Sequence, residues 1–181
     1  QKLEVIENLP ILDLATTPLL LNFICLVFQF NEDFPLNRNE FYKQILDLLL
    51  IRWDEARGIK RDEIYPDLSL LHKMKLLSHL AAITFTKKNY FQLEANLRQL
   101  ITDYLSQHLN SPNDAAALEL ESSSVLKAIE TQHGLLIQRA RGIYSFSHLS
   151  LQQYLTAREI INNLNNQTIS ELMNHLNEKH W

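Results

Sequence analysis

Glycine, proline and cysteine are scarce in this chain of 181 residues, which has three glycines, five prolines and one cysteine. So few turn-forming residues exclude an all-β architecture of many short strands, and a mostly helical fold is favoured. The single cysteine, Cys25, can form no intramolecular disulfide, which points to a reducing compartment, the cytoplasm. We expect Cys25 to be a small buried side chain, because it lies in an apolar run.

Motifs that carry catalysis or metal binding are also missing. The three glycines are too far apart for a phosphate loop of the G-x-x-x-x-G-K-[ST] type. No His-x-x-x-His or Cys-x-x-Cys pair predicts a metal site, and no G-x-S-x-G elbow predicts a hydrolase. This chain by itself is therefore not expected to be an enzyme. It begins with Gln1 and no Met, so we expect it to be a piece of a longer protein.

Charge and hydropathy exclude two further classes of partner. The formal net charge is −4, which gives no general attraction to nucleic acid or to an anionic membrane. From Leu19 to Phe30 nearly every residue is apolar, with Asn22 and Gln29 the exceptions, and this stretch is shorter than the roughly 20 residues that a membrane span needs. A helix buried on most sides, beginning at Pro18, is the better interpretation of that run.

Helical spacing of apolar residues accounts for most of the chain. Short helical pieces are expected before Pro18. Residues 31–37 have loop composition and separate the helix that begins at Pro18 from the helix that begins at Arg38. A polar, alanine-rich stretch after Asn113 is interpreted as a loosely ordered insertion, with a helix capped by Ser123 or Ser124 behind it. The longer predicted helices are 38–57, ended by Gly58, then 70–88, 93–105, a helix ending at Gly134, and the start of another at 168–178.

The segment from Gly134 to Ile161 differs from the rest. Two β-prone runs, Leu135–Ala140 and Ile143–Phe146, are joined by Arg141-Gly142, which is typical of a tight hairpin turn. Ser147 lies where a helix N-cap belongs, so His148 is expected in the first turn of the helix after it. A donor side chain at a helix N-terminus is well placed to hold an anion.

These elements predict a mainly α fold. A helical bundle, residues 1–60, is followed by a winged-helix domain, 61–165, with a small two-stranded β-hairpin, and 166–181 begins a further helical region. The other six histidines are expected to be ordinary surface or partly buried residues: His72, His79, His108, His133, His175 and His180.

Three stretches carry a resemblance to a known family. FSHLSLQQYLTAREI (146–160) resembles the winged-helix signature F-x-H-x-[ST]-[FL]-Q-E-[FY]-x-A-A of NACHT-type signalling ATPases, the STAND nucleotide switches that include NOD-like immune receptors. Gln153 replaces the usual Glu, and Thr156 the usual first Ala. LATTPLLLNFICLVF (14–28) resembles the start of the family's first helical domain, and residues 37–57 are similar to the next helix in many bacterial NACHT proteins.

The resemblance implies a nucleotide switch. A P-loop domain binding ADP or ATP with magnesium would precede this chain in the full-length protein, and the isolated chain would hold no cofactor. Pro18 would lie against the adenine, and His148 would donate to the β-phosphate of ADP in the closed, inactive form. Exchange of ADP for ATP would release the winged helix and expose a surface for self-oligomerisation.

Two other functions stay open. A winged helix can bind DNA, which needs basic residues on a recognition helix. The candidate helix, 123–133, carries Lys127 but also Glu130, while the wing offers Arg139 and Arg141, so nucleic acid is not the expected partner. The third possibility is a helical scaffold for protein partners.

Overall fold

The computed structural model describes residues 15, 17–31, 35, 37–52, 70–108, 115–165, 168, 170, 172, 173 and 175. The chain divides into two compact units, Gln1–Arg61 and Asp62–Trp181. The expected domain boundaries stay predictions, and the helical pieces expected before Pro18, together with Gly58, lie outside the described residues.

The described part of the first unit consists of two α-helices and a π-helical turn. α2 covers Pro18–Asn31, α3 covers Arg38–Asp47, and the π-helical turn η3 covers Leu48–Arg52. The predicted start of α3 is confirmed, because the Asn37 side chain accepts a hydrogen bond from the Glu40 amide at 2.9 Å. Beyond Arg52, the expected helix to residue 57 lies outside the described residues.

One face of α2 is buried, not most of its circumference. Leu20, Ile24 and Val27 recur at helical spacing and are at most 3% exposed. Leu21 is 42% exposed, and Cys25 is exposed as well. The expectation of a buried Cys25 is therefore wrong: when nearly every residue of a helix is apolar, the composition does not reveal which face packs.

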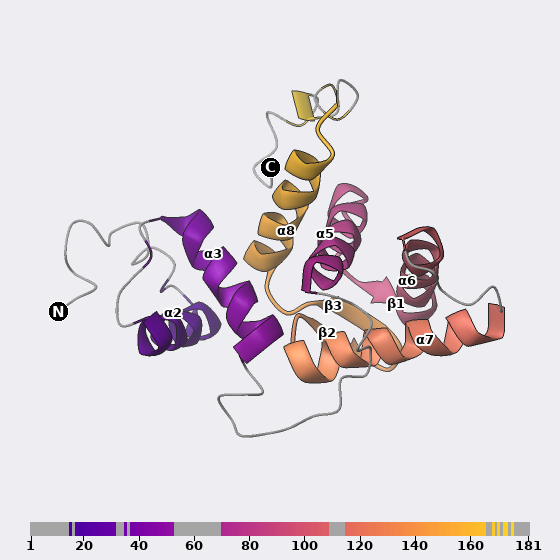
Figure 1. Ribbon diagram of the computed structural model, residues 1–181, viewed down its shortest axis with the longest axis horizontal. Coiled ribbons are helices and arrows are strands. Elements are labelled where there is room, and N and C mark those ends of the chain that lie inside the picture. The colour runs from indigo at the N-terminus through magenta and orange to yellow at the C-terminus, as the bar shows by residue number, and fades with distance from the viewer. Residues whose placement is uncertain are drawn as a thin grey trace. The chain divides into compact units, whose positions relative to one another are not determined.

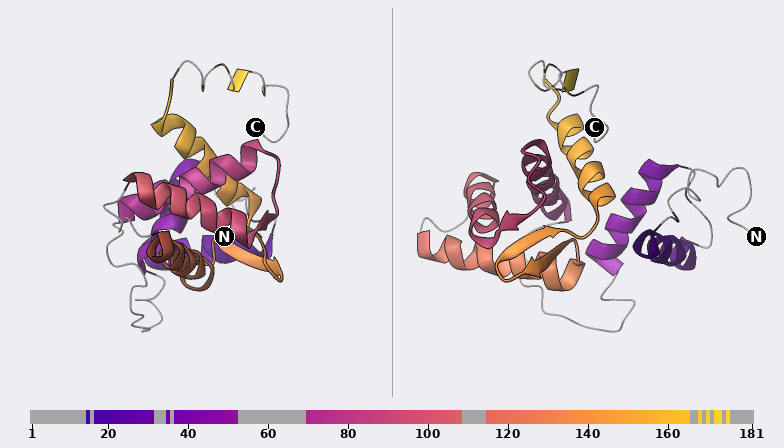
Figure 2. Two further views of the ribbon diagram at one scale, coloured as in Figure 1. Left: turned by 90° about the vertical axis from the view of Figure 1, so that its right-hand side faces the viewer. Right: turned by 180° about the vertical axis from the view of Figure 1, so that it is seen from behind.

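The second unit is built from four α-helices and a small sheet within the described residues. In chain order these are α5 (Leu70–Thr86), β1 (Gln92–Leu93), α6 (Glu94–His108), α7 (Ala115–Ala128), the π-helical turn η4 (Ile129–His133), β2 (Leu136–Ala140), β3 (Ile143–Phe146) and α8 (Leu149–Asn162). α5 lies between α8 and α6, and the sheet lies at one end of α5 and α8 (Figures 1 and 2).

The predicted hairpin is present and gains a third strand. The sheet order is β1-β3-β2, with both pairs antiparallel. Gly142 in the turn has φ +71°, and Gly134 before β2 has φ +61°, so both glycines take the left-handed backbone that the turn and the helix end require. The expected two-stranded sheet is corrected to three strands, because Leu93 pairs with Ile143 and does not begin the next helix.

Two helix starts also differ from expectation. α7 begins at Ala115, so the residues 115–122 are helical and the expected loose insertion and the caps at Ser123 and Ser124 are wrong. The side chain of Ser124 instead donates to the Leu120 carbonyl at 3.0 Å, as a serine inside a helix does. α8 begins one residue later than predicted, at Leu149.

The core of the second unit joins α5, α6, α7 and α8. Its largest fully buried side chains are aliphatic and come from α5, α6 and η4: Leu76, Leu77, Leu80, Leu97, Ile101, Leu105 and Ile129. From α8, Leu151 and Leu155 are 0% exposed. The spacing of Leu151 and Leu155 places one face of α8 against the core. Leu149, the first residue of α8, and the hairpin lie beside His148.

Candidate functional site

His148 is the N-cap of α8, with the extended backbone (φ −144°, ψ 136°) that a cap residue takes. Its Nδ1 accepts a hydrogen bond from the Ser150 amide at 3.2 Å. The predicted cap, Ser147, instead continues the hairpin, because its amide donates to the Leu135 carbonyl at 2.9 Å. His148 is thus one position earlier, relative to the helix, than the sequence predicted.

The cap bond determines which ring nitrogen of His148 can donate. Since Nδ1 accepts, the proton of the neutral imidazole lies on Nε2. Burial lowers the pKa of His148, since the protonated ring would lose solvation there. The side chain is therefore a neutral donor at pH 7, with one N–H available for another group.

A hollow of about 380 Å³ lies beside this imidazole. It collects side chains from the segment before β1, from both strands of the hairpin and from the start of α8. They are Tyr90, Phe91, Arg139, Ser145, Phe146, Ser147, His148, Leu149 and Gln152. Among these described residues Arg139 alone carries a permanent positive charge.

A β-bulge positions Arg139. Gln138 pairs with Tyr144 and Ala140 pairs with Ile143, so Arg139 is an extra residue with no partner across the sheet. Its Nε donates to Ser145 Oγ at 2.9 Å. One bond fixes the guanidinium beside β3, while its other N–H groups can bind a second acceptor.

Ser147 contributes a buried hydroxyl to the same hollow. Its Oγ has no hydrogen-bond partner among the described residues. A buried polar atom in this state costs free energy unless a ligand or water satisfies it. A neutral imidazole N–H, a guanidinium and a hydroxyl at the start of a helix are together suited to the oxygens of an anion.

Pro18 begins α2, as predicted, and its side chain is exposed. The Thr17 hydroxyl caps the helix by accepting from the Leu20 amide at 3.3 Å. Pro18 belongs to the first unit and His148 to the second. The proposed roles of both residues at a nucleotide stay predictions.

Sequence reasoning does not place Arg139 and Ser147 in one site with His148. The sequence indicates Arg139 only as a wing residue for DNA, and Ser147 only as a cap. A bulge leaves no signature in the alternation of the hairpin, so the position of Arg139 cannot be read from the sequence. The buried Ser147 hydroxyl results from the one-residue shift of the cap.

The described part of the chain contains neither a metal-binding cluster nor a membrane-spanning helix. No group of three or more His, Cys, Asp or Glu side chains in that part of the chain could hold a metal ion. Within the same ranges, no helix is long and apolar enough to cross a membrane.

The fold of the second unit, with its helices, its hairpin and the helix after the wing, is that of a winged-helix domain. Residues 38–160 match the family described as the winged helix-turn-helix domain C-terminal to NACHT, and the chain belongs to this family. The resemblance to NACHT-type proteins is thereby confirmed, and the chain is a NACHT-associated regulatory part. Neither the curated proteins nor the solved structures that were compared include a match to this chain.

Proposed function

We propose that this chain is the closing part of an ATP/ADP-dependent switch in the cytoplasm. A NACHT domain ahead of it binds the nucleotide with magnesium, and His148 Nε2–H donates to the β-phosphate of ADP. The observation that carries the proposal is the cap bond, which occupies Nδ1 and leaves Nε2 as the donor beside the hollow. Family membership supports the position of the chain after a NACHT domain.

The residues around His148 fit a diphosphate. His148 is neutral, so it gives direction but no charge, and Arg139 supplies the charge in the same hollow. Ser147 also lines the hollow, and its buried hydroxyl has no partner among the described residues. A bound nucleotide supplies the anionic oxygens, and the chain's residues hold and orient them. Pro18, exposed at the start of α2, would contact the adenine.

The rim of the hollow supports a closed contact with the preceding domain. Phe91 and Leu149 line it and are 61% and 41% exposed. A mostly apolar lining with a few polar groups is typical of a site that binds a ligand. On exchange of ADP for ATP this contact would open, and the surface released would support self-oligomerisation.

The free energy of one contact is sufficient for this role. A hydrogen bond to a charged group contributes about 1.5–3 kcal/mol. That difference shifts a two-state equilibrium by roughly tenfold or more. The chain alone is expected to bind nucleotide weakly and to show no ATP hydrolysis above a heat-inactivated control.

The test compares two substitutions of His148 in the full-length protein. His148→Asn keeps a side-chain acceptor at the cap but removes the imidazole, while His148→Ala removes both. We expect both variants to retain less ADP after purification and to have higher basal activity than wild type. Only His148→Ala should also lose about 0.5–2 kcal/mol of stability.

The measurements are the nucleotide content of the purified protein, by chromatography of the released nucleotide, and urea unfolding. Wild-type ADP occupancy in His148→Asn would overturn the proposal. Loss of ADP only in His148→Ala would assign the effect to the helix cap and not to the phosphate.

A further inference from the structure

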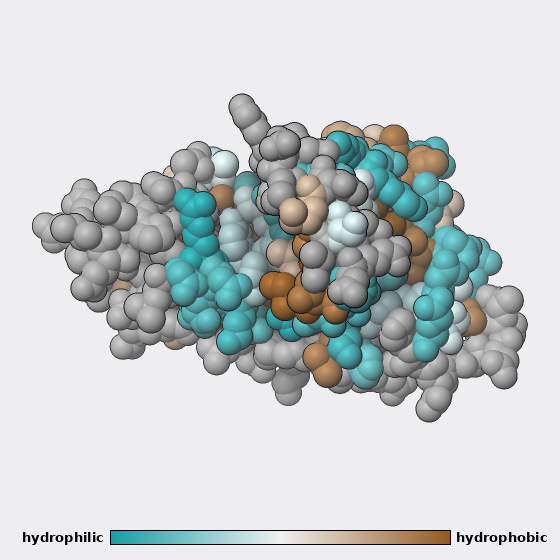
Figure 3. All heavy atoms as spheres, turned by 90° about the horizontal axis from the view of Figure 1, so that it is seen from above, coloured by the Kyte–Doolittle hydropathy of each residue, from teal (hydrophilic) through white to brown (hydrophobic). Residues whose placement is uncertain are grey.

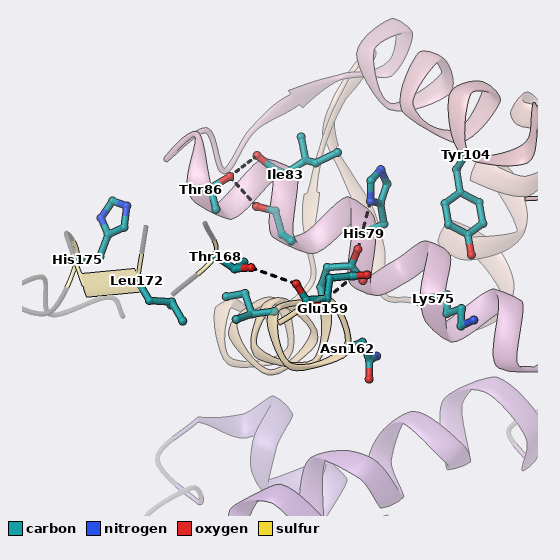
Figure 4. Close-up of a pocket in the computed structure, with 13 residues that line it drawn as sticks. Lys75, His79, Ile83, Thr86, Tyr104, Glu159, Asn162, Thr168, Leu172 and His175 are labelled. Atoms are coloured by element: carbon teal, nitrogen blue, oxygen red, sulfur yellow. Dashed lines mark hydrogen bonds and ion pairs between the residues drawn. The ribbon is translucent and has the colours of Figure 1, made fainter. Parts of the chain in front are cut away.

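A second and larger cavity, of about 770 Å³, lies at the other end of α8. Its walls come from α5, α6, the last turn of α8 and four described residues beyond it (Figure 4). Cavities of 300–1,000 Å³ are the usual size for sites that bind small organic molecules. The cavity shares no residue with the hollow at His148, so a ligand bound here does not depend on the proposed function.

Apolar side chains make up part of this lining. Ile83 comes from α5, Ile160 from α8, and Leu172 from the segment after α8. Figure 3 looks onto this end of the second unit and shows apolar side chains lying among polar ones. Ile161 and Leu164, which follow Ile160 in the chain and do not line the cavity, are 71% and 59% exposed. A ligand with an apolar body would gain from burying part of this surface.

The polar side of the cavity is centred on Glu159. Its side chain is 20% exposed, and His79 Nδ1 lies 3.4 Å from its carboxylate (Figure 4). Among the described residues no Lys or Arg lies within ion-pair distance of Glu159. A carboxylate can accept several hydrogen bonds, so the contact with His79 leaves Glu159 able to accept from a further donor.

Two features near Glu159 favour a cation. The last carbonyl groups of α8 carry partial negative charge, and Glu159 lies one turn before the helix ends at Asn162. The rings of His79 and Tyr104 lie 5.7 Å apart and form an aromatic wall. The face of a tyrosine ring attracts a cation. Burial, and then the nearby charge of Glu159, raise the pKa of Tyr104.

We infer that this cavity binds a small organic cation, with a protonated amine on Glu159 and an apolar body against Ile83, Ile160 and Leu172. Lys75 also lines the cavity, with an exposed side chain, and would attract a carboxylate instead. A preference for a cationic ligand would therefore indicate binding at Glu159, and a preference for an anionic ligand would indicate binding at Lys75.

The test uses three probes with the same body and different head groups: 4-phenylbutylamine, 4-phenylbutanol and 4-phenylbutyrate. Each is titrated into the chain by calorimetry at low salt. We expect the amine to bind about fivefold more tightly than the alcohol, the gain typical of a partly exposed ion pair. The carboxylate should bind more weakly than the alcohol.

Two variants locate the effect. Glu159→Gln has nearly the same shape and should bind amine and alcohol equally, with the affinity for the alcohol unchanged. Glu119→Gln, which removes a carboxylate that pairs with Arg98 on α6, is the matched control and should keep the preference for the amine. Circular dichroism confirms that each variant is folded.

Three outcomes would overturn the inference. They are no saturable binding of any probe to wild type, equal or tighter binding of the alcohol or the carboxylate, and a preference for the amine that survives Glu159→Gln. If Glu159→Gln is destabilised, the comparison of the three head groups in the wild-type chain still tests the inference.

Discussion

One imidazole has two hydrogen-bonding roles at the start of α8. His148 Nδ1 caps the helix, and Nε2 is the donor that we propose for the β-phosphate. Protonation of Nδ1 would remove the acceptor on which the cap depends. The charge state of this residue therefore affects both the stability of the domain and its proposed contact with nucleotide.

The stability of the chain should fall as the pH falls. Because burial lowers the pKa of His148 in the folded state, the unfolded chain takes up the proton first, as the pH drops through the ordinary value of 6.5. The free energy of unfolding then decreases until the pH passes the lowered pKa. Urea unfolding at pH 7.5 and pH 5.5 measures this loss.

His148→Asn is the control for the pH effect, because asparagine caps a helix without titrating. The loss between the two pH values should be smaller in this variant than in wild type. An equal loss would show that other groups cause the pH dependence.

Arg139 should contribute to retention of ADP through its charge. In the full-length protein we expect Arg139→Gln to weaken ADP binding roughly tenfold at low salt, because a charge-assisted hydrogen bond is lost. The difference from wild type should shrink at high salt, where the exposed charge is screened. Nucleotide dissociation rates at two salt concentrations provide the measurement.

Arg141 is the matched control for Arg139. It lies at the exposed hairpin turn and does not line the hollow, so Arg141→Gln should behave as wild type. Equal loss in both variants would show a general effect of net charge. If Arg139→Gln retains ADP as wild type does while His148→Asn loses it, the role of Arg139 is refuted and that of His148 is not.

The residues of the site can be predicted only in part. The motif and the place after the hairpin single out His148, but its predicted helix-capping position is wrong by one residue. Arg139 and Ser147 join it through a bulge and a buried hydroxyl, which depend on pairing across the sheet and on packing. Local sequence patterns carry no information about either.

At the scale of elements, a buried hydrogen bond fixes α8 against α5. Gln152 Nε2 donates to Thr84 Oγ1 at 2.9 Å, and these residues are 3% and 2% exposed. The Thr84 hydroxyl in turn donates to the Leu80 carbonyl at 2.8 Å. Gln152 is the glutamine of the motif that contains His148, so the motif combines a surface residue with a residue that anchors the helix.

Removing both partners of this bond should cost less than the sum of the two single losses. Thr84→Val leaves the Gln152 amide buried without its acceptor, and Gln152→Leu leaves the hydroxyl without its donor. We expect each to lower the free energy of unfolding by about 1–3 kcal/mol. The double variant should lose clearly less than the sum, as thermal or urea unfolding of all four proteins will show. Additive losses would mean that the two side chains are not coupled.

Elements with strong local signals are predicted correctly, and weaker ones are not. Asn37 and Gly134 bound their helices as expected, because capping chemistry is local. β1 has two residues and shows no alternation that could reveal a strand. The predicted start of α7 is wrong because the polar, alanine-rich stretch taken for a loose insertion is helical from Ala115, in keeping with the helix propensity of alanine, leucine and glutamate.

At the scale of the whole molecule, the charges do not favour DNA. Lys127, on the candidate recognition helix, forms an ion pair with Glu130 at 2.9 Å. Nearby, Glu119 pairs with Arg98 at 2.9 Å. A recognition helix whose basic side chain is already paired has little to offer a phosphate backbone.

We therefore expect no shift of a DNA duplex in a gel with the chain at roughly 150 mM salt. The titration should be repeated at low salt, where non-specific binding is strongest. Binding at both salt concentrations, with a steep decrease in affinity between them, would favour the transcription regulator. A full-length sequence without a phosphate loop ahead of this chain would favour the helical scaffold.

α8 has a proposed ligand site at each end. His148 precedes its first residue and Glu159 lies 11 residues further on, about 16 Å along a helix that rises about 1.5 Å per residue. If opening of the switch moves α8, both sites change together. Thermodynamic reciprocity then requires each ligand to alter the affinity of the protein for the other ligand by the same factor. An amine bound at the far end would become an allosteric effector of the nucleotide, and the nucleotide an effector of the amine.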